Sequence, residues 1–271
     1  MVAHTSLWLA LLAATVGPAA AGAPAPLTAA WQDAAERLVN DANQAFAQAQ
    51  PAPGANALER EMGEAVTLLN VQPRTEGNVA RARAMLEKAA REAPAGEVSI
   101  FANYFLARVH ESYEEPAEPD QARLIYRELI ERYSGDSLAE NSAARLVLMD
   151  LYANIPAHER SRRFVALEKL GAQLKSADGR RDYHLNMGNA YIDFEGSRAS
   201  AIAHFLAAEA EGITHREVEA ATWIAIGELA RAEGRTSLAR RYYGKFLAKY
   251  PRDNRHYTIQ RRLEALPADP G

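Results

Sequence analysis

Apolar residues recur at intervals of three and four along most of this chain, which is the spacing of one face of an α-helix. No stretch alternates apolar and polar residues in the manner of a half-buried strand. The pattern predicts an all-α fold that begins with one helix, followed by a Pro- and Gly-containing linker at residues 51–56. The apolar stripe expected on that first helix consists of Trp31, Ala35, Leu38, Ala42 and Ala45.

Beyond the linker the chain repeats itself. Residues 122–137 align with residues 239–254 without a gap, and each segment is a helical pattern that ends in a tyrosine and a polar turn. The equivalent pairs are Ala122 and Ala239, Tyr126 and Tyr243, Tyr133 and Tyr250, and Asp136 and Asp253. Recurrence of this kind indicates a repeat protein, in which each unit packs on its neighbours.

The second of these segments belongs to a longer unit, residues 222–251, which resembles the tetratricopeptide repeat (TPR), a helix–turn–helix unit of roughly 34 residues. The positions that carry the resemblance are Trp223, Ile226, Gly227, Ala230, Gly234, Ala239, Tyr243 and Pro251. Gly227 and Ala239 are small where two helices would cross closely, and Gly234 stands where the turn needs unusual backbone angles. The resemblance implies a right-handed solenoid of helical hairpins.

Weaker copies of the unit begin near Met62, Tyr104, Arg145 and Tyr183, which gives about five repeats and a polar-faced capping helix after them. The predicted organisation is a signal peptide (1–21), an N-terminal helix with its linker (22–56), TPR-like repeats (57–252), and a capping helix with a tail (253–271).

The N-terminus resembles an export signal. The apolar run at residues 6–17 is shorter than the ~20 residues that a membrane-spanning helix needs, and small residues follow it. Ala19-Ala20-Ala21 fits the rule for signal cleavage, so we expect a cut after Ala21, a periplasmic or secreted protein, and no stable membrane insertion afterwards. The alternative is an uncleaved anchor, because no Lys or Arg precedes the apolar run. The repeats also look like those of exported bacterial envelope proteins, which implies a role in envelope assembly or maintenance.

Composition excludes several classes of function. With 31 basic and 35 acidic residues the net charge is −4, and no long basic run offers a surface for nucleic acid. Cysteine is absent, which excludes disulfides and thiolate metal sites. The seven histidines show no close ligand spacing, and the acidic stretch at residues 113–120 is interpreted as a solvated turn. We therefore predict no cofactor and no metal.

Two short motifs suggest a chemistry that the repeats argue against. Gly135-Asp136-Ser137-Leu138 spells the nucleophile block of GDSL-type ester hydrolases, and Asp253 with His256 could complete a triad. Such a serine follows a β-strand, whereas the residues before Ser137 have a charged, helical pattern. Ser137 with Glu140 instead predicts a capping box at the start of the next helix. The hydrolase is therefore a remote alternative, and we predict that the protein is not an enzyme.

Binding to another protein is the function that remains. In TPR proteins the first helix of each pair lines a concave surface that contacts the ligand. By position, the residues expected on that surface are Tyr104, Arg108, Leu146, Asp150, Leu185, Asn189, Asp193, Ile224, Glu228 and Arg231. Their mixture of both charges with apolar side chains predicts a protein or peptide partner, and the resemblance to envelope proteins implies that this partner is in the envelope. The alternative is a self-associating structural solenoid, in which the helix around Trp31 docks on another copy.

Overall fold

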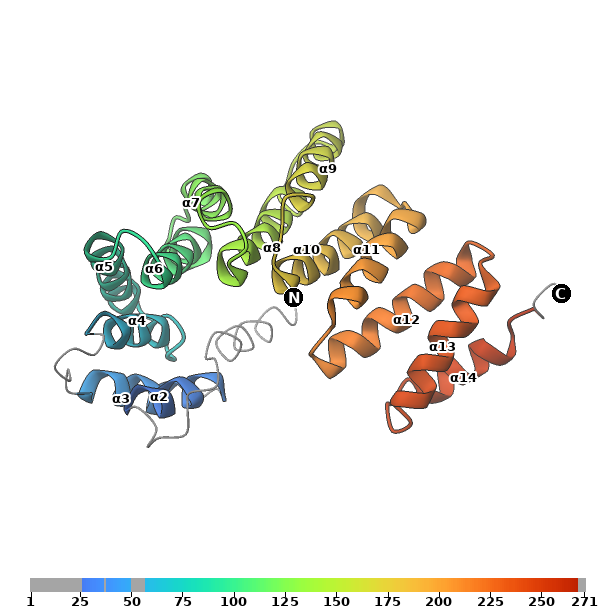
Figure 1. Cartoon of the computed structure of the whole chain (residues 1–271), viewed down its shortest axis with the longest axis horizontal. Coiled ribbons are helices and arrows are strands. Elements are labelled where there is room, and N and C mark those ends of the chain that lie inside the picture. The colour runs from blue at the N-terminus through green and yellow to red at the C-terminus, as the bar shows by residue number, and fades with distance from the viewer. Residues whose placement is uncertain (1–25, 37, 50–56, 268–271) are drawn as a thin grey trace. The chain divides into compact units, whose positions relative to one another are not determined.

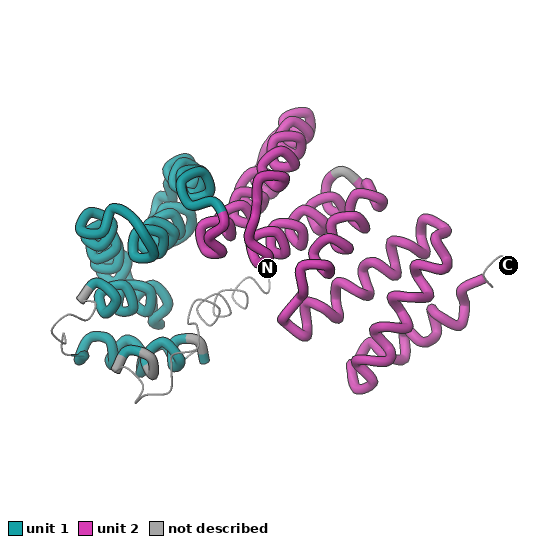
Figure 2. The backbone as a smooth tube through the Cα atoms, viewed as in Figure 1, with its two compact units in different colours: residues 1–134 teal, residues 135–271 magenta. Residues whose placement is uncertain are grey.

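The structure is a computed structural model that describes residues 26–36, 38–49 and 57–267. Every regular element in these ranges is a helix, so the all-α prediction is confirmed (Figure 1). The chain divides into two compact units, residues 1–134 and 135–271 (Figure 2). The predicted signal peptide and the linker at residues 51–56 lie outside the described residues. Within the described ranges, no helix has both the length and the apolar composition of a membrane span.

Unit 1 is a series of helices in which each helix packs against the next. Its helices are α2 (Pro26–Ala35), α3 (Val39–Gln48), α4 (Ala57–Leu68), α5 (Glu76–Glu92), α6 (Glu97–Arg108) and α7 (Pro119–Arg132). A π-helical turn, η1 (Val109–Tyr113), extends α6 before the loop to α7. The pairs α4–α5 and α6–α7 correspond to the first two predicted repeats.

Unit 2 also consists of helices that pack on their neighbours along the chain. Its helices are α8 (Ser137–Leu151), α9 (Ala157–Gly171), α10 (Ala177–Ala190), α11 (Arg198–Glu211), α12 (Arg216–Ala232), α13 (Thr236–Lys249) and α14 (His256–Glu264), with a π-helical turn, η2 (Tyr191–Glu195), after α10. Helix α8 packs on both α9 and α10, and from α10 onward each helix packs on its successor. Sequentially packed helical hairpins, as predicted, are therefore the architecture of this unit.

The N-terminal segment differs from its prediction, because it forms a hairpin of two helices instead of one helix. Helix α2 ends at Ala35 and α3 begins at Val39, so the predicted stripe does not lie on one face. Leu38 is 46 % exposed and Ala45 is also exposed, whereas Phe46 is fully buried. The core that the hairpin shares with α4 consists of Ala30, Trp31, Ala34, Ala42, Phe46 and Val66. The single-helix prediction was wrong because it carried the helical period across residues 36–38.

In two helical hairpins, a glycine of the first helix lets an aromatic ring of the second helix come close. A Cβ atom added to Gly227 would lie 2.4 Å from Cε1 of Tyr243, and one added to Gly188 would lie 2.6 Å from Cε1 of Phe205. Both rings are buried, so neither can easily move aside. Gly234, in the turn between α12 and α13, has a φ of +71°, which favours glycine. The predicted roles of Gly227 and Gly234 therefore agree with the structure.

Equivalent tyrosines of the two aligned segments make equivalent hydrogen bonds. Tyr126 of α7 donates to Glu111 of η1 at 2.7 Å, and Tyr243 of α13 donates to Glu228 of α12. In both cases the acceptor lies 15 residues earlier in the sequence. The aligned tyrosines thus share one interaction, a hydrogen bond that joins the second helix of a pair to the element before it.

The turn before α8 caps that helix, but through a different residue than predicted. Asp136 is the N-cap, and its Oδ1 accepts a hydrogen bond from Ala139 N–H at 2.8 Å. Ser137 is the first residue of the helix, and no side-chain bond from it to the helix terminus is present in the described residues. The predicted capping box was wrong because the N-cap lies one residue earlier, which puts Glu140 beyond the position that closes such a box.

Glu140 instead joins the starts of two helices. Its side chain is fully buried and accepts hydrogen bonds from the backbone N–H groups of Gly135 at 2.7 Å, Lys175 at 2.8 Å and Ser176 at 2.6 Å. The Ser176 hydroxyl donates a further bond at 2.8 Å, and Ser176 is the N-cap of α10. One carboxylate therefore fixes the turn before α8 and the turn before α10.

Candidate partner-binding surface

Four of the ten residues predicted to contact a partner are buried. Tyr104, Arg108, Leu146 and Asp150 are each at most 6 % exposed. Helix α6 packs between α5 and α7, and α8 packs on both α9 and α10, so these helices have little free face at those positions. The expectation of a surface position is corrected for these four residues, which belong to the interior.

The buried charges among these four have partners inside their own unit. Arg108 Nη1 lies 2.7 Å from Glu111 Oε2, which also accepts the hydrogen bond from Tyr126. Asp150 Oδ1 lies 3.8 Å from Nη1 of Arg163. Such pairing makes burial of a charged side chain tolerable, which position in a repeat alone does not reveal.

The other six residues lie in unit 2 on α10, η2 and α12 and form what we call the unit 2 surface: Leu185, Asn189, Asp193, Ile224, Glu228 and Arg231. Asn189, Asp193 and Arg231 are exposed, and the remaining three are half-buried. Leu185 and Ile224 both pack against the same core cluster of unit 2. Helices α10 and α12, each the first of its pair, thus offer polar side chains to solvent beside apolar side chains that are only partly covered.

Glu228 is the most connected residue of the unit 2 surface. It accepts a hydrogen bond from Tyr243, and its carboxylate lies 3.1 Å from Nη2 of Arg231 and 2.7 Å from Nη1 of Arg262 in α14. Burial raises the pKa of Glu228, but the hydrogen bonds from Tyr243 and Arg231 outweigh it and the pKa is lowered. Two guanidinium groups therefore surround one carboxylate, which leaves positive charge in excess here.

A second feature of unit 2, not found from the sequence, is an exposed aromatic cluster where α8 and η2 end. The Tyr152 hydroxyl donates to Asp193 Oδ2 at 2.6 Å, and its ring meets the ring of Phe194 edge-on at 4.8 Å. Arg160 lies over the Phe194 ring, 4.3 Å from its centroid. Tyr152 and Ile192 are each 42 % exposed. Only the aromatic residues at two helix ends could have signalled this cluster.

A polar network joins α9, α10 and α11. His184 Nδ1 lies 2.8 Å from His204 Nδ1, and His204 Nε2 lies 3.0 Å from Glu168 Oε1, which also accepts a bond from Tyr191 at 2.7 Å. Only one hydrogen can lie between the two Nδ1 atoms, so one histidine donates to the other. Burial and the neighbouring His204 lower the pKa of His184 to about 4. The network therefore joins α9, α10 and α11 through hydrogen bonds between their side chains.

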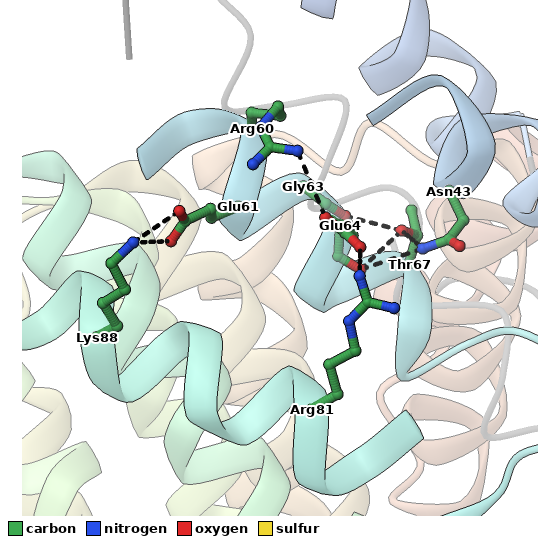
Figure 3. Close-up of polar contacts among 8 residues, drawn as sticks. All are labelled: Asn43, Arg60, Glu61, Gly63, Glu64, Thr67, Arg81 and Lys88. Atoms are coloured by element: carbon green, nitrogen blue, oxygen red, sulfur yellow. Dashed lines mark hydrogen bonds and ion pairs between the residues drawn. The ribbon is translucent and has the colours of Figure 1, made fainter. Parts of the chain in front are cut away.

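A polar network in unit 1 binds α3 and α5 to α4 (Figure 3). Glu64 of α4 is 3 % exposed and pairs with Arg81 of α5 and, at 3.8 Å, with Arg60. Asn43 of α3 donates to the Glu64 carbonyl at 3.3 Å and to the Thr67 hydroxyl at 2.8 Å. Because these groups satisfy one another across helix contacts, we interpret the network as structural.

Trp31 is engaged inside its own chain. Its ring meets Phe46 at 4.8 Å and Phe101 at 5.7 Å, and its Nε1–H donates to Glu59 Oε1 at 3.1 Å. The side chain is only 8 % exposed. The Trp31 side chain therefore belongs to the interior of unit 1, and docking of the helix around it on another copy stays a prediction.

The residues of the remote hydrolase alternative do not form a triad. Ser137 begins α8 and His256 begins α14, which lie at opposite ends of the series of packed helices in unit 2 (Figure 1). The Asp253 carboxylate is held by the Arg255 guanidinium at 2.8 and 2.9 Å, and this bond lowers the pKa of Asp253 to about 2. A serine triad requires nucleophile, base and acid in hydrogen-bond contact, so this reading of the motifs is wrong.

One family model and one solved structure are similar to parts of this chain. The family model of the tetratricopeptide repeat matches residues 223–253, which are most of α12, all of α13 and the turn after it. A crystal structure of a thermophilic TPR protein in Thermus thermophilus is similar over 77 % of this chain and 98 % of that chain, with 19 % identity and a TM-score of 0.46. No curated protein matches the sequence significantly. The chain thus carries a tetratricopeptide repeat at residues 223–253, within its series of helical hairpins.

Proposed function

We propose that the protein is an exported TPR scaffold that binds a protein or peptide partner and takes part in assembly or maintenance of the cell envelope. The observation that carries the binding role is the tetratricopeptide repeat at residues 223–253. Its first helix presents Ile224, Glu228 and Arg231 at half-buried or exposed positions. Repeats of this architecture use such positions to hold extended partners.

The chemistry of the unit 2 surface favours a partner with a carboxylate next to an apolar side chain. Arg231 and Arg262 share one carboxylate, that of Glu228, and the Arg231 side chain is 48 % exposed. Guanidinium groups bind carboxylates in a fixed, bidentate geometry. The half-buried Ile224 and Leu185 can take up the apolar side chain of the same partner.

Crosslinking followed by affinity capture tests this proposal, with residues 22–271 as bait and an envelope extract as source. We expect Arg231→Glu and Asn189→Arg each to lose a partner that the wild type retains, because both residues are exposed on first helices. The matched controls are Arg162→Glu in α9, a second helix, and Gln173→Arg in the turn after it, both at exposed positions. Equal capture by wild type, surface variants and controls would contradict the proposal.

Export is a separate part of the proposal, supported by the apolar run at residues 6–17 and the small residues after it. Expression of the full chain followed by cell fractionation and N-terminal sequencing tests it. We expect the mature protein outside the cytoplasm, beginning at Gly22. A chain that keeps Met1 and stays with the membrane would instead identify the segment as an anchor.

A further inference from the structure

Three potential metal ligands converge where α6 and η1 lead into the loop before α7. Nδ1 of His110 lies 3.0 Å from Oε2 of Glu114 and 2.9 Å from Oε2 of Glu118. The three ligand atoms all lie within 4.8 Å of one another. The residues follow each other at intervals of four, and Glu114 and Glu118 lie in the acidic stretch at residues 113–120 that the sequence predicts to be a solvated turn.

The histidine of this cluster is buried and its ring nitrogen lacks a hydrogen bond. The His110 side chain is 7 % exposed, and both His110 Nδ1 and Glu114 Oε2 are buried atoms without a hydrogen-bond partner among the described residues. The short contacts are therefore close approaches that lack the directions of hydrogen bonds. A single imidazole hydrogen could in any case satisfy only one of the two carboxylate oxygens that face it.

The backbone holds the three residues in place. Within the segment, Glu114 N–H donates to the Val109 carbonyl at 3.2 Å, the bond that closes the π-helical turn, and Glu118 N–H donates to the His110 carbonyl at 2.8 Å. The second bond folds the loop back onto the histidine. Single π-helical turns of this kind are frequent at functional sites.

The cation that pairs with the cluster does not neutralise its carboxylates. Arg83 of α5 pairs with the other oxygen of Glu114 and, at 2.8 Å, with Glu87, so one cation serves two carboxylates. That pairing leaves Glu114 Oε2 directed at His110, and an outer partner of this type orients a metal-binding carboxylate. The Glu118 side chain is 55 % exposed, so the cluster has an open side.

We propose that His110, Glu114 and Glu118 bind a divalent first-row transition metal ion, with Zn²⁺ as the best-fitting class. An imidazole nitrogen with two carboxylate oxygens suits zinc, whereas magnesium and calcium prefer oxygen ligands alone. Ligands at roughly 2.0–2.2 Å from a tetrahedral ion would stand about 3.3 Å apart, close to the contacts of His110 with the two carboxylates. The fourth position lies on the open side, where water or a partner's ligand can occupy it.

Such an ion would join the end of α6 and η1 to the residue that directly precedes α7. His110 and Glu114 belong to η1 and its end, and Glu118 is the residue directly before α7. The metal would then stabilise the α6–α7 hairpin and place a ligand-accepting centre at one end of it. This role does not depend on the partner proposed for unit 2.

Calorimetric titration of Zn²⁺ into the tag-free, EDTA-treated full chain is the test. We expect the wild type to bind one equivalent of Zn²⁺. In His110→Gln and in Glu118→Gln, this equivalent should be lost or its affinity for the protein weakened by about tenfold or more. Because Glu118 is largely exposed, its variant should remain folded by circular dichroism even where the buried His110 variant does not. Co²⁺ should show visible absorption bands with the wild type that both variants lack.

Two control variants match the two test variants. Glu115→Gln removes an exposed carboxylate from the same loop, and His158→Gln removes an exposed histidine in α9. Both should bind Zn²⁺ as the wild type does, while Mg²⁺ and Ca²⁺ should not compete. Absence of zinc binding by the wild type, or its full retention in folded Glu118→Gln, would overturn the proposal.

Discussion

Gly227 and Gly244 belong to the same helical hairpin but have very different surroundings. A Cβ atom on Gly227 would lie 2.4 Å from the buried ring of Tyr243, whereas one on Gly244 would meet nothing within 4 Å. We expect Gly227→Ala to destabilise unit 2 by about 1–3 kcal/mol, because the ring or the helix must shift to admit the methyl group. Urea denaturation followed by circular dichroism gives the difference.

Gly244→Ala is the matched control for that substitution. An alanine in an open helical position should stabilise the protein by about 0.5–1 kcal/mol, because it restricts the unfolded backbone. Equal effects of the two substitutions would show that the predicted close crossing of α12 and α13 at Gly227 is absent.

Glu140 is held by hydrogen-bond donors from the turns before α8 and α10. Burial raises the pKa of its carboxyl, but hydrogen bonds from Ser176, Gly135 and Lys175 outweigh that effect and the pKa is lowered. Glu140→Gln puts an NH₂ group among these donors and should cost about 1.5–3 kcal/mol by urea denaturation. Glu131→Gln, at an exposed position in α7, should change stability little. A small loss for Glu140→Gln would mean that the turns before α8 and α10 are held by other contacts.

The network of His184, His204 and Glu168 joins α9, α10 and α11 and should make these helices sensitive to mild acid. The pKa of His184 is about 4, well below its ordinary value of 6.5, because of burial and the adjacent His204. The groups that face it also include Glu168, Glu211 and Arg180. Between these two pH values the unfolded chain binds more protons than the folded one, so stability should fall as the pH falls through this window.

Thermal denaturation at about pH 7 and at about pH 5 measures this effect. The melting temperature of the wild type should drop between the two conditions, and His184→Gln should show a smaller drop because its side chain does not titrate. His215→Gln, an exposed position before α12, is the control and should behave as the wild type does. An identical drop in all three proteins would assign the acid sensitivity to other groups.

The sequence predicts some helices better than others for physical reasons. The α12–α13 hairpin was predictable, because Trp223, Gly227 and Tyr243 each report a packing constraint at a fixed spacing. The break between α2 and α3 was not, because no Pro or Gly marks residues 36–38. The π-helical turns likewise leave the hydrophobic period nearly unchanged while shifting later residues around the helix.

The residues of the candidate surfaces also divide into those that the sequence predicts and those that it does not. Exposure of Asn189 and Arg231 followed from their place in the repeat, but burial of Arg108 and Asp150 depends on the helices that pack against α6 and α8. Convergence of His110 with Glu118 depends on a loop that folds back, which helical spacing does not report. Sequence periodicity gives the side of a helix, whereas long-range pairing decides whether that side is covered.

Each unit has a core of its own. The cluster around Trp223, Tyr243 and Phe246 consists entirely of residues of unit 2, and the clusters around Phe46, Leu86 and Met62 lie entirely in unit 1. In repeat proteins, stability is approximately a sum of terms for individual repeats and for their nearest-neighbour contacts. Damage to the core of unit 2 should therefore leave the unfolding of unit 1 largely unchanged.

The tryptophans allow this independence to be measured, because Trp31 reports on unit 1 and Trp223 on unit 2 once residues 1–21 are removed. In the background Trp31→Phe, Gly227→Ala should lower the urea midpoint of the Trp223 fluorescence transition. In the background Trp223→Phe, the same Gly227→Ala should leave the midpoint of the Trp31 transition in place. Parallel shifts in both backgrounds would mean that the chain unfolds as one cooperative body, with coupling between repeats that exceeds the stability of either unit alone.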